Sequence, residues 1–371
     1  MRIVVITKRQ YMSKDLIDDR YGRFYEIPLE LSKLGHEVIG VTLSYRKRDE
    51  GILIDNLEEH YKCQWYSYNL RNFILPRIKK HQDRLQAIVE SFKADVIWSC
   101  SDTLHAIIGS KLSKKTGIPY VVDLYDNFES YGLSHIPGIQ PLFKRAIKNA
   151  NTTTCISQAL ARYVSINYKP KGTVSVLENA IPENLFHSMD KASCRQHLNL
   201  PVDALYMGTA GALNHERGID ILFKGYKQLS REFNNLHLLI AGPLGKNITL
   251  PDDPKIHYLD KLSYDKVPYL INSLDLAVVC NRNTSFGKFC FPQKIYEFIA
   301  CHTPFIASAV GATDELLKEY PYCLYQADDL KSFISVATDQ LKHPRQAEID
   351  TPTWKDQALK LESALNISKK I

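Results

Sequence analysis

Apolar and polar positions form two kinds of segment that alternate along the whole chain. Short runs rich in valine, isoleucine and leucine are typical of buried strands, and the segments between them show the spacing of amphipathic helices. This alternation predicts parallel sheets covered by helices on both faces, an α/β fold. The predicted strands are Arg2–Thr7, His36–Leu43, Gln64–Tyr68, Asp95–Cys100, Tyr120–Tyr125, Thr153–Ile156, Thr173–Leu177, Leu205–Thr209, His237–Ala241, Ile256–Leu259, Leu276–Cys280, Phe305–Ala309 and Cys323–Tyr325.

The series is interrupted once, near the middle of the chain, by the turn signal Asn179-Ala180-Ile181-Pro182. A chain of 371 residues is long for one core. We therefore predict two doubly wound domains, 1–186 and 187–352, whose ligands bind at the carboxyl ends of the strands. The predicted helices are Phe24–Leu34, His105–Lys115, Phe143–Ala150, Ile219–Leu229, Lys266–Leu274, Gln293–Ala300, Asp314–Tyr320, Leu330–Leu341 and Trp354–Ile367.

The composition is that of a soluble globular protein, with 44% apolar and 24% charged residues. No apolar run approaches the ~18–20 residues that cross a bilayer, and the apolar run within Met1–Thr7 is too short for a signal peptide. The eight cysteines form no C-x-x-C pair, and scattered cysteines of this kind are mostly buried free thiols in a reducing compartment. We therefore expect a cytoplasmic protein.

The net charge of +6 lies mostly in the first half of the chain. Part of it belongs to a basic amphipathic stretch, which can lie on an anionic membrane or form the solvated face of a surface helix. The membrane interpretation implies a peripheral protein at the inner face of the plasma membrane. Nucleic-acid binding is not expected, because neither zinc-finger spacing nor an aromatic RNA-binding box is present. The basic residues of the stretch are Arg71, Arg77, Lys79, Lys80 and Arg84.

One charged residue interrupts an apolar helix near the C-terminus. Glu297 lies in the run Ile295–Ala300, within a predicted loop, short helix, turn and buried strand spanning Phe291–Ser308. Burying a carboxylate without a partner is strongly unfavourable. Glu297 is therefore expected to face a ligand, or to pair with a neighbouring lysine or a backbone group.

A glycine-bearing loop follows the first predicted strand of the second domain. The segment Gly208–Asp220 leads from this strand through Gly211 into a helix N-terminus, which is a favourable place for an anion. Arg217 in the same loop would add a bidentate contact to phosphate oxygens. The alternative is that Arg217 forms a surface ion pair with Glu216 or Asp220.

Polar residues also end two predicted strands of the first domain. Asp126 follows the fifth strand and His105 follows the fourth, so both are expected to face a ligand at the carboxyl edge of the sheet. Polar residues at such places can equally cap helices, and Asp102 is a good N-cap candidate. Gly22, at the start of the first helix, either lets a backbone N–H approach a phosphate or simply forms a turn.

These motifs together resemble the retaining, family-4-type (group 1) glycosyltransferases of the GT-B fold. The resemblance rests on Phe291–Ser308, on Gly208–Asp220 and on the helix and turn from Tyr21 to Val38, and it covers nearly the whole chain. It implies two Rossmann-like domains facing a cleft, with the acceptor on the N-terminal domain and a nucleotide sugar on the C-terminal domain. It also implies that a helix at 353–371 packs back onto the first domain.

The resemblance implies roles for the candidate residues. Glu297 would hold the ribose of the nucleotide sugar, while glycines and cations would accommodate its diphosphate. Neither a metal ion nor a cofactor other than the donor substrate is implied. The residues implied in catalysis are Arg217, Lys294, Asp126 and His105, and those implied in donor binding are Gly22, Gly211, Arg217, Lys294 and Glu297.

The chain departs from the family pattern at several positions. Phe289 stands where many relatives have a first glutamate, which removes one expected contact to the sugar. His302 replaces the glycine of a tight turn, where histidine is among the better tolerated residues. Relatives often carry a basic residue near Ala212, and Lys294 or Lys288 could supply that charge instead.

The resulting prediction is a metal-independent, retaining glycosyltransferase. It would move a hexose-type sugar from a nucleoside-diphosphate sugar to a glycan or lipid-linked glycan in cell-surface polysaccharide synthesis. H-E-x-x-H, D-x-D, G-x-S-x-G and the Walker pattern are absent from the sequence. Two alternatives stay open: a non-hydrolysing sugar-nucleotide epimerase, and a catalytically silent sugar-nucleotide-binding subunit.

Overall fold

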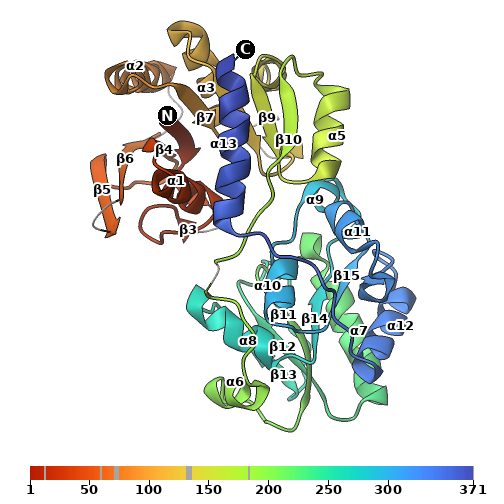
Figure 1. The fold of residues 1–371 in the computed structure, drawn as a ribbon. Coiled ribbons are helices and arrows are strands. Elements are labelled where there is room, and N and C mark those ends of the chain that lie inside the picture. Colours follow the sequence, from red (N-terminus) through yellow and green to blue (C-terminus); the bar gives the residue numbers. More distant parts are fainter. Residues whose placement is uncertain (12–13, 59–60, 71–74, 131–135, 183, 371) are drawn as a thin grey trace. The chain divides into compact units, whose positions relative to one another are not determined.

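The computed structural model describes residues 1–11, 14–58, 61–70, 75–130, 136–182 and 184–370. The chain folds into two compact units (Figure 1). Unit 1 consists of Met1–Asn179 and Trp354–Ile371, and unit 2 consists of Ala180–Thr353. The boundary expected from the sequence, after residue 186, lies a few residues beyond this division.

The sheet of unit 1 has eight strands in the order β10-β9-β8-β7-β1-β4-β6-β5. Every pairing is parallel except that of β5 with β6, which is antiparallel and corrects the expectation of an all-parallel sheet. A hairpin needs only a short turn, so it can add an edge strand without a crossover helix. The strands are β1 (Arg2–Lys8), β4 (Glu37–Ser44), β5 (Gly51–Glu58), β6 (Tyr61–Asn69), β7 (Val96–Ser99), β8 (Tyr120–Leu124), β9 (Thr152–Cys155) and β10 (Thr173–Val176), and β2 (Gln10–Tyr11) pairs separately with β3 (Lys14–Asp15).

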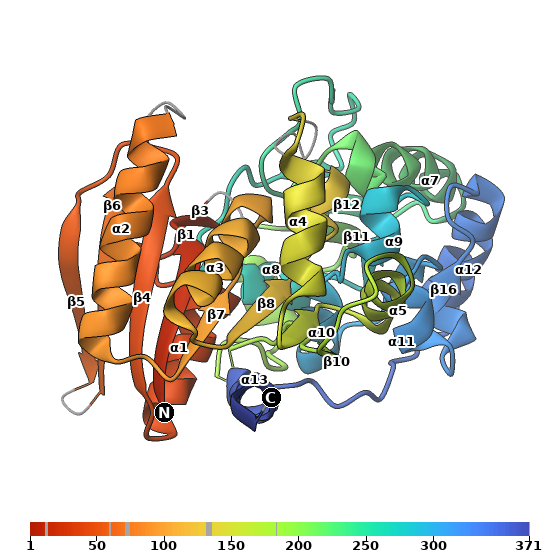
Figure 2. The same cartoon turned by 90° about the horizontal axis from the view of Figure 1, so that it is seen from above.

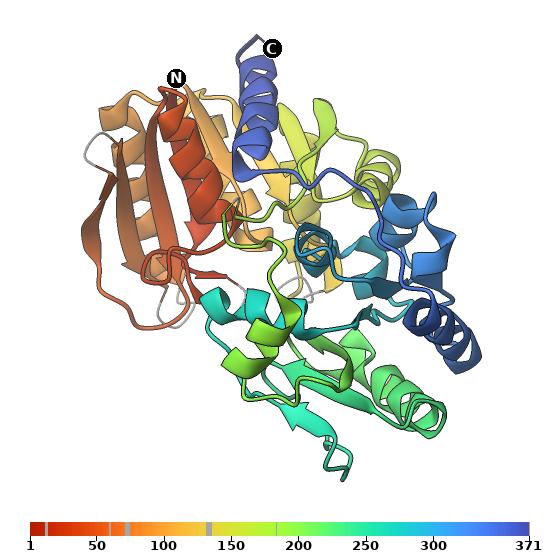
Figure 3. The same cartoon turned by 60° about the horizontal axis from the view of Figure 1, so that its bottom comes forward.

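Helices cover both faces of this sheet. Helices α2, α3 and α4 lie side by side across one face (Figure 2), and α1 and α13 lie together on the other (Figure 3). The central strand β1 lies between these helix layers, and its apolar residues Ile3–Ile6 are fully buried. The helices are α1 (Arg23–Lys33), α2 (Leu75–Phe92), α3 (Thr103–Thr116), α4 (Ile139–Lys148), α5 (Gln158–Asn167), α13 (Trp354–Lys370) and the single-turn η1 (Phe128–Ser130).

The C-terminal helix α13 belongs to unit 1. Its Leu361 and Leu365 are fully buried, and its Ser368 hydroxyl lies 2.9 Å from the Thr152 hydroxyl of β9. Unit 1 is thus completed by the last part of the chain.

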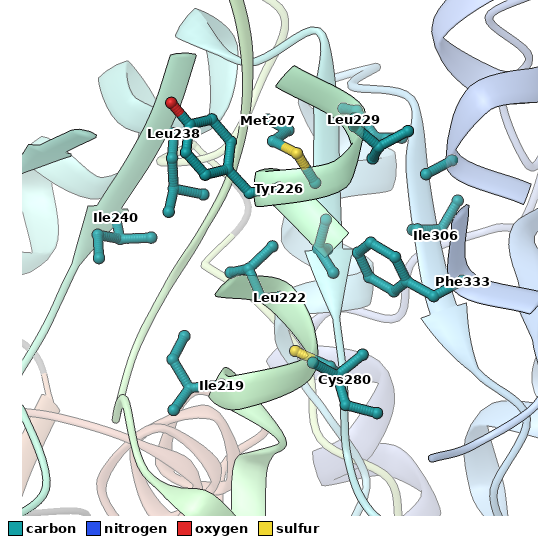
Figure 4. Close-up of a cluster of buried hydrophobic side chains, with 14 of the residues drawn as sticks. Met207, Ile219, Leu222, Tyr226, Leu229, Leu238, Ile240, Cys280, Ile306 and Phe333 are labelled. Atoms are coloured by element: carbon teal, nitrogen blue, oxygen red, sulfur yellow. The ribbon is translucent and has the colours of Figure 1, made fainter. Parts of the chain in front are cut away.

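Unit 2 contains a six-stranded parallel sheet in the order β13-β12-β11-β14-β15-β16. Its buried side chains, among them Met207, Leu222, Ile306 and Phe333, form one core between sheet and helices (Figure 4). The short helices α6 and α9 were not predicted from the sequence. The elements are α6 (Lys191–His197), β11 (Leu205–Ala210), η3 (His215–Arg217), α7 (Ile219–Glu232), β12 (Leu236–Ala241), β13 (Ile256–Tyr258), η4 (Tyr264–Lys266), α8 (Val267–Ser273), β14 (Leu276–Val279), α9 (Ser285–Phe289), α10 (Lys294–Ala300), β15 (Phe305–Ser308), α11 (Ala312–Leu317), η5 (Pro321–Cys323), β16 (Leu324–Tyr325) and α12 (Leu330–Lys342).

Apart from the β5–β6 hairpin, the strand order reverses once in each sheet. The reversal lies between β1 and β7 in unit 1 and between β11 and β14 in unit 2. In doubly wound sheets, ligands bind outside the carboxyl ends of the strands at such a reversal. Candidate sites are therefore expected after Lys8 and Ser99 in unit 1, and after Ala210 and Val279 in unit 2.

Two further expectations can be compared with the structure. All eight cysteines are buried free thiols, as predicted. Within the described part of the chain, no helix combines the length and hydropathy needed to cross a membrane.

Candidate functional site

The candidate site of unit 2 begins where β11 ends. Gly211 follows this strand with φ 121, a conformation that residues with a side chain rarely adopt. A Cβ added to Gly211 would lie 3.3 Å from the Lys294 Nζ. The missing side chain therefore leaves room for a lysine that comes from a distant part of the chain.

Lys294 begins α10, and its ammonium group lies across the end of β11. Its Nζ donates to the Thr209 Oγ1 at 3.2 Å. Burial, together with the positive charge of Arg217, lowers the pKa of Lys294 to about 8. Two cations thus converge at the end of β11, which favours the binding of an anion.

Arg217 reaches the same place from η3. The side chain of Asn214 accepts a hydrogen bond from the Arg217 N–H at 3.0 Å and so fixes the turn. The guanidinium lies 4.7 Å from the centre of the Phe286 ring, and its Nη1 lies 3.6 Å from the Cys290 Sγ. Asp220, one of the predicted ion-pair partners of Arg217, instead pairs with Arg282 at 2.6 Å.

Glu297 lies one turn after Lys294 on α10, so both side chains project from the same face of this helix. Glu297 is only 8% exposed. Burial raises the pKa of its carboxyl group to about 7, while the charge of Lys294 and a hydrogen bond from Tyr264 oppose this rise. A carboxyl group held in this way accepts hydrogen bonds from a ligand best once it is ionised.

The structure therefore brings together Gly211, Arg217, Lys294 and Glu297, which the sequence analysis singled out. Lys288, the other cation considered there, is exposed on α9. Phe289, where relatives often carry a glutamate, is also on α9 and partly buried. The arrangement offers two cations for an anionic group and a carboxylate for hydroxyl groups.

Sequence reasoning missed Arg282, which supports the site. Its Nε donates to the His215 carbonyl at 2.8 Å, and its guanidinium pairs with Asp220 and with Asp328. Arg282 thereby ties the η3 turn to loops that follow β14 and β16. Its position just after a strand that borders the reversal was a usable signal.

A second polar cluster lies at the strand reversal of unit 1. The Lys8 Nζ donates to the Tyr125 hydroxyl at 2.9 Å, and Asp126 is buried nearby at the end of β8. Burial lowers the pKa of Lys8, against the raising effect of the charges of Asp102 and Asp126. Lys8 was not predicted, although it ends the strand that borders the reversal.

His105 contributes to this cluster through Asp102. The imidazole is fully buried, and its Nδ1 lies 2.6 Å from an Asp102 oxygen. Asp102 also accepts a hydrogen bond from the Tyr45 hydroxyl at 2.9 Å and caps α3 as expected. Burial alone would raise the pKa of Asp102, but the charge and hydrogen bond of His105 lower it. Asp102, rather than the imidazole, is the member of this pair with an exposed surface.

Gly22 is the N-cap residue of α1 and has φ 83. A Cβ at this position would lie 2.4 Å from the Tyr11 ring, so close packing already requires a glycine. The next residue, Arg23, is fully buried and pairs with Asp123 at 3.0 Å. Gly22 therefore begins a helix that is anchored to the sheet.

Two doubly wound units, one of which presents converging cations and a buried carboxyl group beside the strand reversal, define a protein of the GT-B class. The chain belongs to the group 1, or family 4, glycosyltransferases. The model of "Glycosyl transferases group 1" matches residues 204–343, and that of "Glycosyltransferase Family 4" matches residues 24–185.

Two relatives with curated names match part of the chain. A protein of Bacillus subtilis, TuaH, is named as a glycosyltransferase of teichuronic acid biosynthesis and is 22% identical over 197 residues. The D-inositol 3-phosphate glycosyltransferase of Stackebrandtia nassauensis is 26% identical over 158 residues. The matches cover 52% and 37% of this chain, but only 48% and 34% of the two relatives.

Solved structures match over the whole chain. Sucrose-phosphate synthase from Thermosynechococcus elongatus aligns with a TM-score of 0.74 and 16% identity, covering 100% of this chain and 97% of that one. HepE of Anabaena in complex with UDP-glucose aligns with a TM-score of 0.70 and 14% identity, covering 100% and 98%. At these identities the likeness establishes the fold.

Proposed function

We propose that this chain transfers a hexose-type sugar from a UDP-sugar to a hydroxyl group of a glycan or lipid-linked glycan. The observation that carries the proposal is the convergence of Arg217 and Lys294 at the end of β11, beside the carboxyl group of Glu297. Support for the nucleotide comes from HepE, which is described in complexes with UDP and with UDP-glucose. Support for a polysaccharide acceptor comes from the name of TuaH.

The two cations would act on the charge that develops during transfer. The bond between the anomeric carbon and the diphosphate oxygen breaks, and the anomeric carbon bonds to the acceptor oxygen. The diphosphate leaves with additional negative charge, which Arg217 and Lys294 would stabilise without a metal ion. In a retaining reaction on one face of the sugar, the leaving phosphate takes the proton of the acceptor hydroxyl.

Glu297 and the unit 1 cluster would bind other parts of the substrates. The carboxylate of Glu297 would accept hydrogen bonds from the ribose hydroxyls of the donor. Lys8, Asp102 and Asp126 would bind hydroxyl groups of the acceptor at the strand reversal of unit 1. Phe289 would leave the sugar without the carboxylate contact that a glutamate provides.

A nucleotide panel tests the proposal. Thermal unfolding is measured with UDP, UDP-glucose, ADP and GDP, because a ligand that binds only the folded state raises the apparent stability. We expect UDP and UDP-sugars to raise the melting temperature of the wild type and to lose most of this effect with Arg217→Ala. No shift with any nucleotide would contradict the proposal.

Turnover distinguishes the remaining interpretations. Transfer of labelled sugar to a glycan or lipid extract is expected, with UDP as the second product. Conversion of the UDP-sugar to an isomer without any acceptor would indicate an epimerase. Binding without either reaction would indicate a silent subunit.

A further inference from the structure

In one continuous segment of unit 1, every residue charged at neutral pH is a lysine or an arginine. Residues 130–177 include six lysine and arginine residues and no aspartate or glutamate. All six cations are exposed. The segment covers η1 in part, α4, β9, α5 and β10, so the excess belongs to one edge of the unit 1 sheet. The cations are Lys144, Arg145, Lys148, Arg162, Lys169 and Lys171.

The same segment exposes large aliphatic side chains. Ile136 is 47% exposed, Leu142 is 42% exposed and Ile166 is 69% exposed. On α4 the buried face holds Phe143 and Ile147. Leu142 therefore lies on the outer side of α4, together with cations of the same helix.

The residues that follow α5 pack against α4. The ring of Tyr168, which follows α5, meets the ring of Phe143 on α4 edge-on at 6.0 Å. The Lys171 N–H donates to the Lys148 carbonyl at 3.0 Å. The Lys144 Nζ lies 5.9 Å from the centre of the Tyr168 ring. The cations of α4 and those after α5 thus lie in neighbouring parts of the fold.

We propose that the surface formed by α4, α5 and the residues after α5 binds an anionic lipid membrane. Its charge complements anionic head groups, and its exposed aliphatic side chains can enter the boundary between head groups and acyl chains. A soluble polyanion would be bound by the cations alone and would gain nothing from exposed Leu142 and Ile166. The aliphatic residues therefore favour a lipid surface over a nucleic acid or an acidic glycan.

This surface differs from the basic stretch noted in the sequence. Arg71 lies outside the described residues, and the side chain of Arg77 is not described. Lys79 and Lys80 are exposed on α2, whereas Leu85 is fully buried against the core. Among the described side chains of α2, these two cations are exposed and no large aliphatic side chain is. Helix α2 therefore serves as an internal control for the effect of charge alone.

Two matched triple variants of the full chain test the charge. One carries Lys144→Gln, Arg145→Gln and Lys148→Gln on α4, and the other carries Lys79→Gln, Lys80→Gln and Arg84→Gln on α2. Each removes two lysines and one arginine, so the net charge changes equally. Binding is measured by co-sedimentation with vesicles of phosphatidylcholine, with or without phosphatidylglycerol, and folding by the melting temperature.

We expect the wild type to bind only the anionic vesicles. Each cation near an anionic surface contributes about a fivefold change in partitioning, so the α4 variant should bind about a hundredfold more weakly. The α2 variant should bind the anionic vesicles less than tenfold more weakly than the wild type. Equal losses in both variants, or equal binding of the wild type to neutral and anionic vesicles, would overturn the proposal.

A second matched pair tests the aliphatic contribution. The variant Leu142→Ser with Ile166→Ser is compared with Ile52→Ser and Leu359→Ser, which are exposed elsewhere in unit 1. High salt screens the charges, so the binding that persists should depend on Leu142 and Ile166. Retention on heparin without any vesicle binding would identify a soluble polyanion instead and would overturn the proposal. None of these measurements depends on sugar transfer.

Discussion

At the scale of single residues, Glu297 combines deep burial with a proposed role in donor binding. If its carboxylate accepts bonds from ribose, Glu297→Gln keeps the shape and loses charge-assisted hydrogen bonds, which contribute roughly 1.5–3 kcal/mol each. We expect the dissociation constant of the UDP-sugar, measured by calorimetry, to rise by about one to two orders of magnitude. The melting temperature should not fall.

Arg217→Ala provides the contrasting variant for this prediction. It should weaken the binding of free pyrophosphate as well as that of the nucleotide sugar, whereas Glu297→Gln should spare pyrophosphate. If Glu297 has only a structural role, the glutamine variant would unfold at a lower temperature and bind the donor as well as the wild type does.

His302 adopts φ 52 in the turn between α10 and β15, as expected for a residue in place of a glycine. A β-branched residue is strained in this conformation by roughly 1–2 kcal/mol. We expect His302→Val to be less stable than His302→Gly by about 1 kcal/mol, since glycine loses part of its advantage to chain entropy. Chemical denaturation of both variants measures this difference, and equal stability would show that the turn relaxes.

At the scale of elements, we expect the first turn of α10 to couple donor binding to pH. The pKa of Glu297 is raised to about 7, chiefly by burial, and the pKa of Lys294 is lowered to about 8, also chiefly by burial. Below pH 7 the carboxyl group becomes protonated, and above pH 8 the amine loses its charge. We expect donor affinity to be highest between these values and to fall on both sides.

Titration calorimetry of UDP from pH 5.5 to 9.5 tests this profile. Glu297→Gln should flatten the acidic side, and Lys294→Met should flatten the alkaline side. An affinity of the wild type that does not change across this range would contradict the assignment of both groups to the site.

The elements themselves were largely predictable from the sequence. Buried strands such as Leu276–Val279 and long amphipathic helices such as Ile219–Glu232 have strong local patterns, and the structure contains them. The strand Gly51–Glu58 was missed because its continuous apolar run, Ile52–Ile54, is only three residues long and is followed by polar residues. The helix Ser285–Phe289 was missed because five residues cannot show a helical period.

The site was predictable only where a residue belongs to a local motif. Arg217, Lys294 and Glu297 were found in this way. Lys8 and Arg282 were missed because their contacts, to Tyr125 and to Asp328, join positions far apart in the sequence. The register of parallel strands creates such contacts, and no short segment of the sequence encodes them.

At the scale of the whole molecule, the proposed chemistry relies on protein cations. The described residues contain no cluster of three or more histidine, cysteine, aspartate or glutamate side chains suited to a metal ion. We expect sugar transfer by the full chain to survive excess EDTA and to change little on addition of magnesium. Complete loss of activity with EDTA, restored by magnesium or manganese, would show that a metal carries the diphosphate charge.

Glu297 and Lys294 on α10 also affect the folding stability of the protein when no donor is bound. The raised pKa of Glu297 makes folding less favourable as pH rises from about 4.5 to 7, and the lowered pKa of Lys294 makes folding more favourable only as pH rises beyond about 8. Between about pH 7 and pH 8 both charges therefore destabilise the empty unit 2, in the range where we expect the donor to bind best. Lys294→Met combined with Glu297→Leu should therefore raise the melting temperature at pH 7.5 and abolish donor binding. It also follows that the wild type should resist proteolysis better when its donor is abundant, so that the substrate would help to set the amount of enzyme.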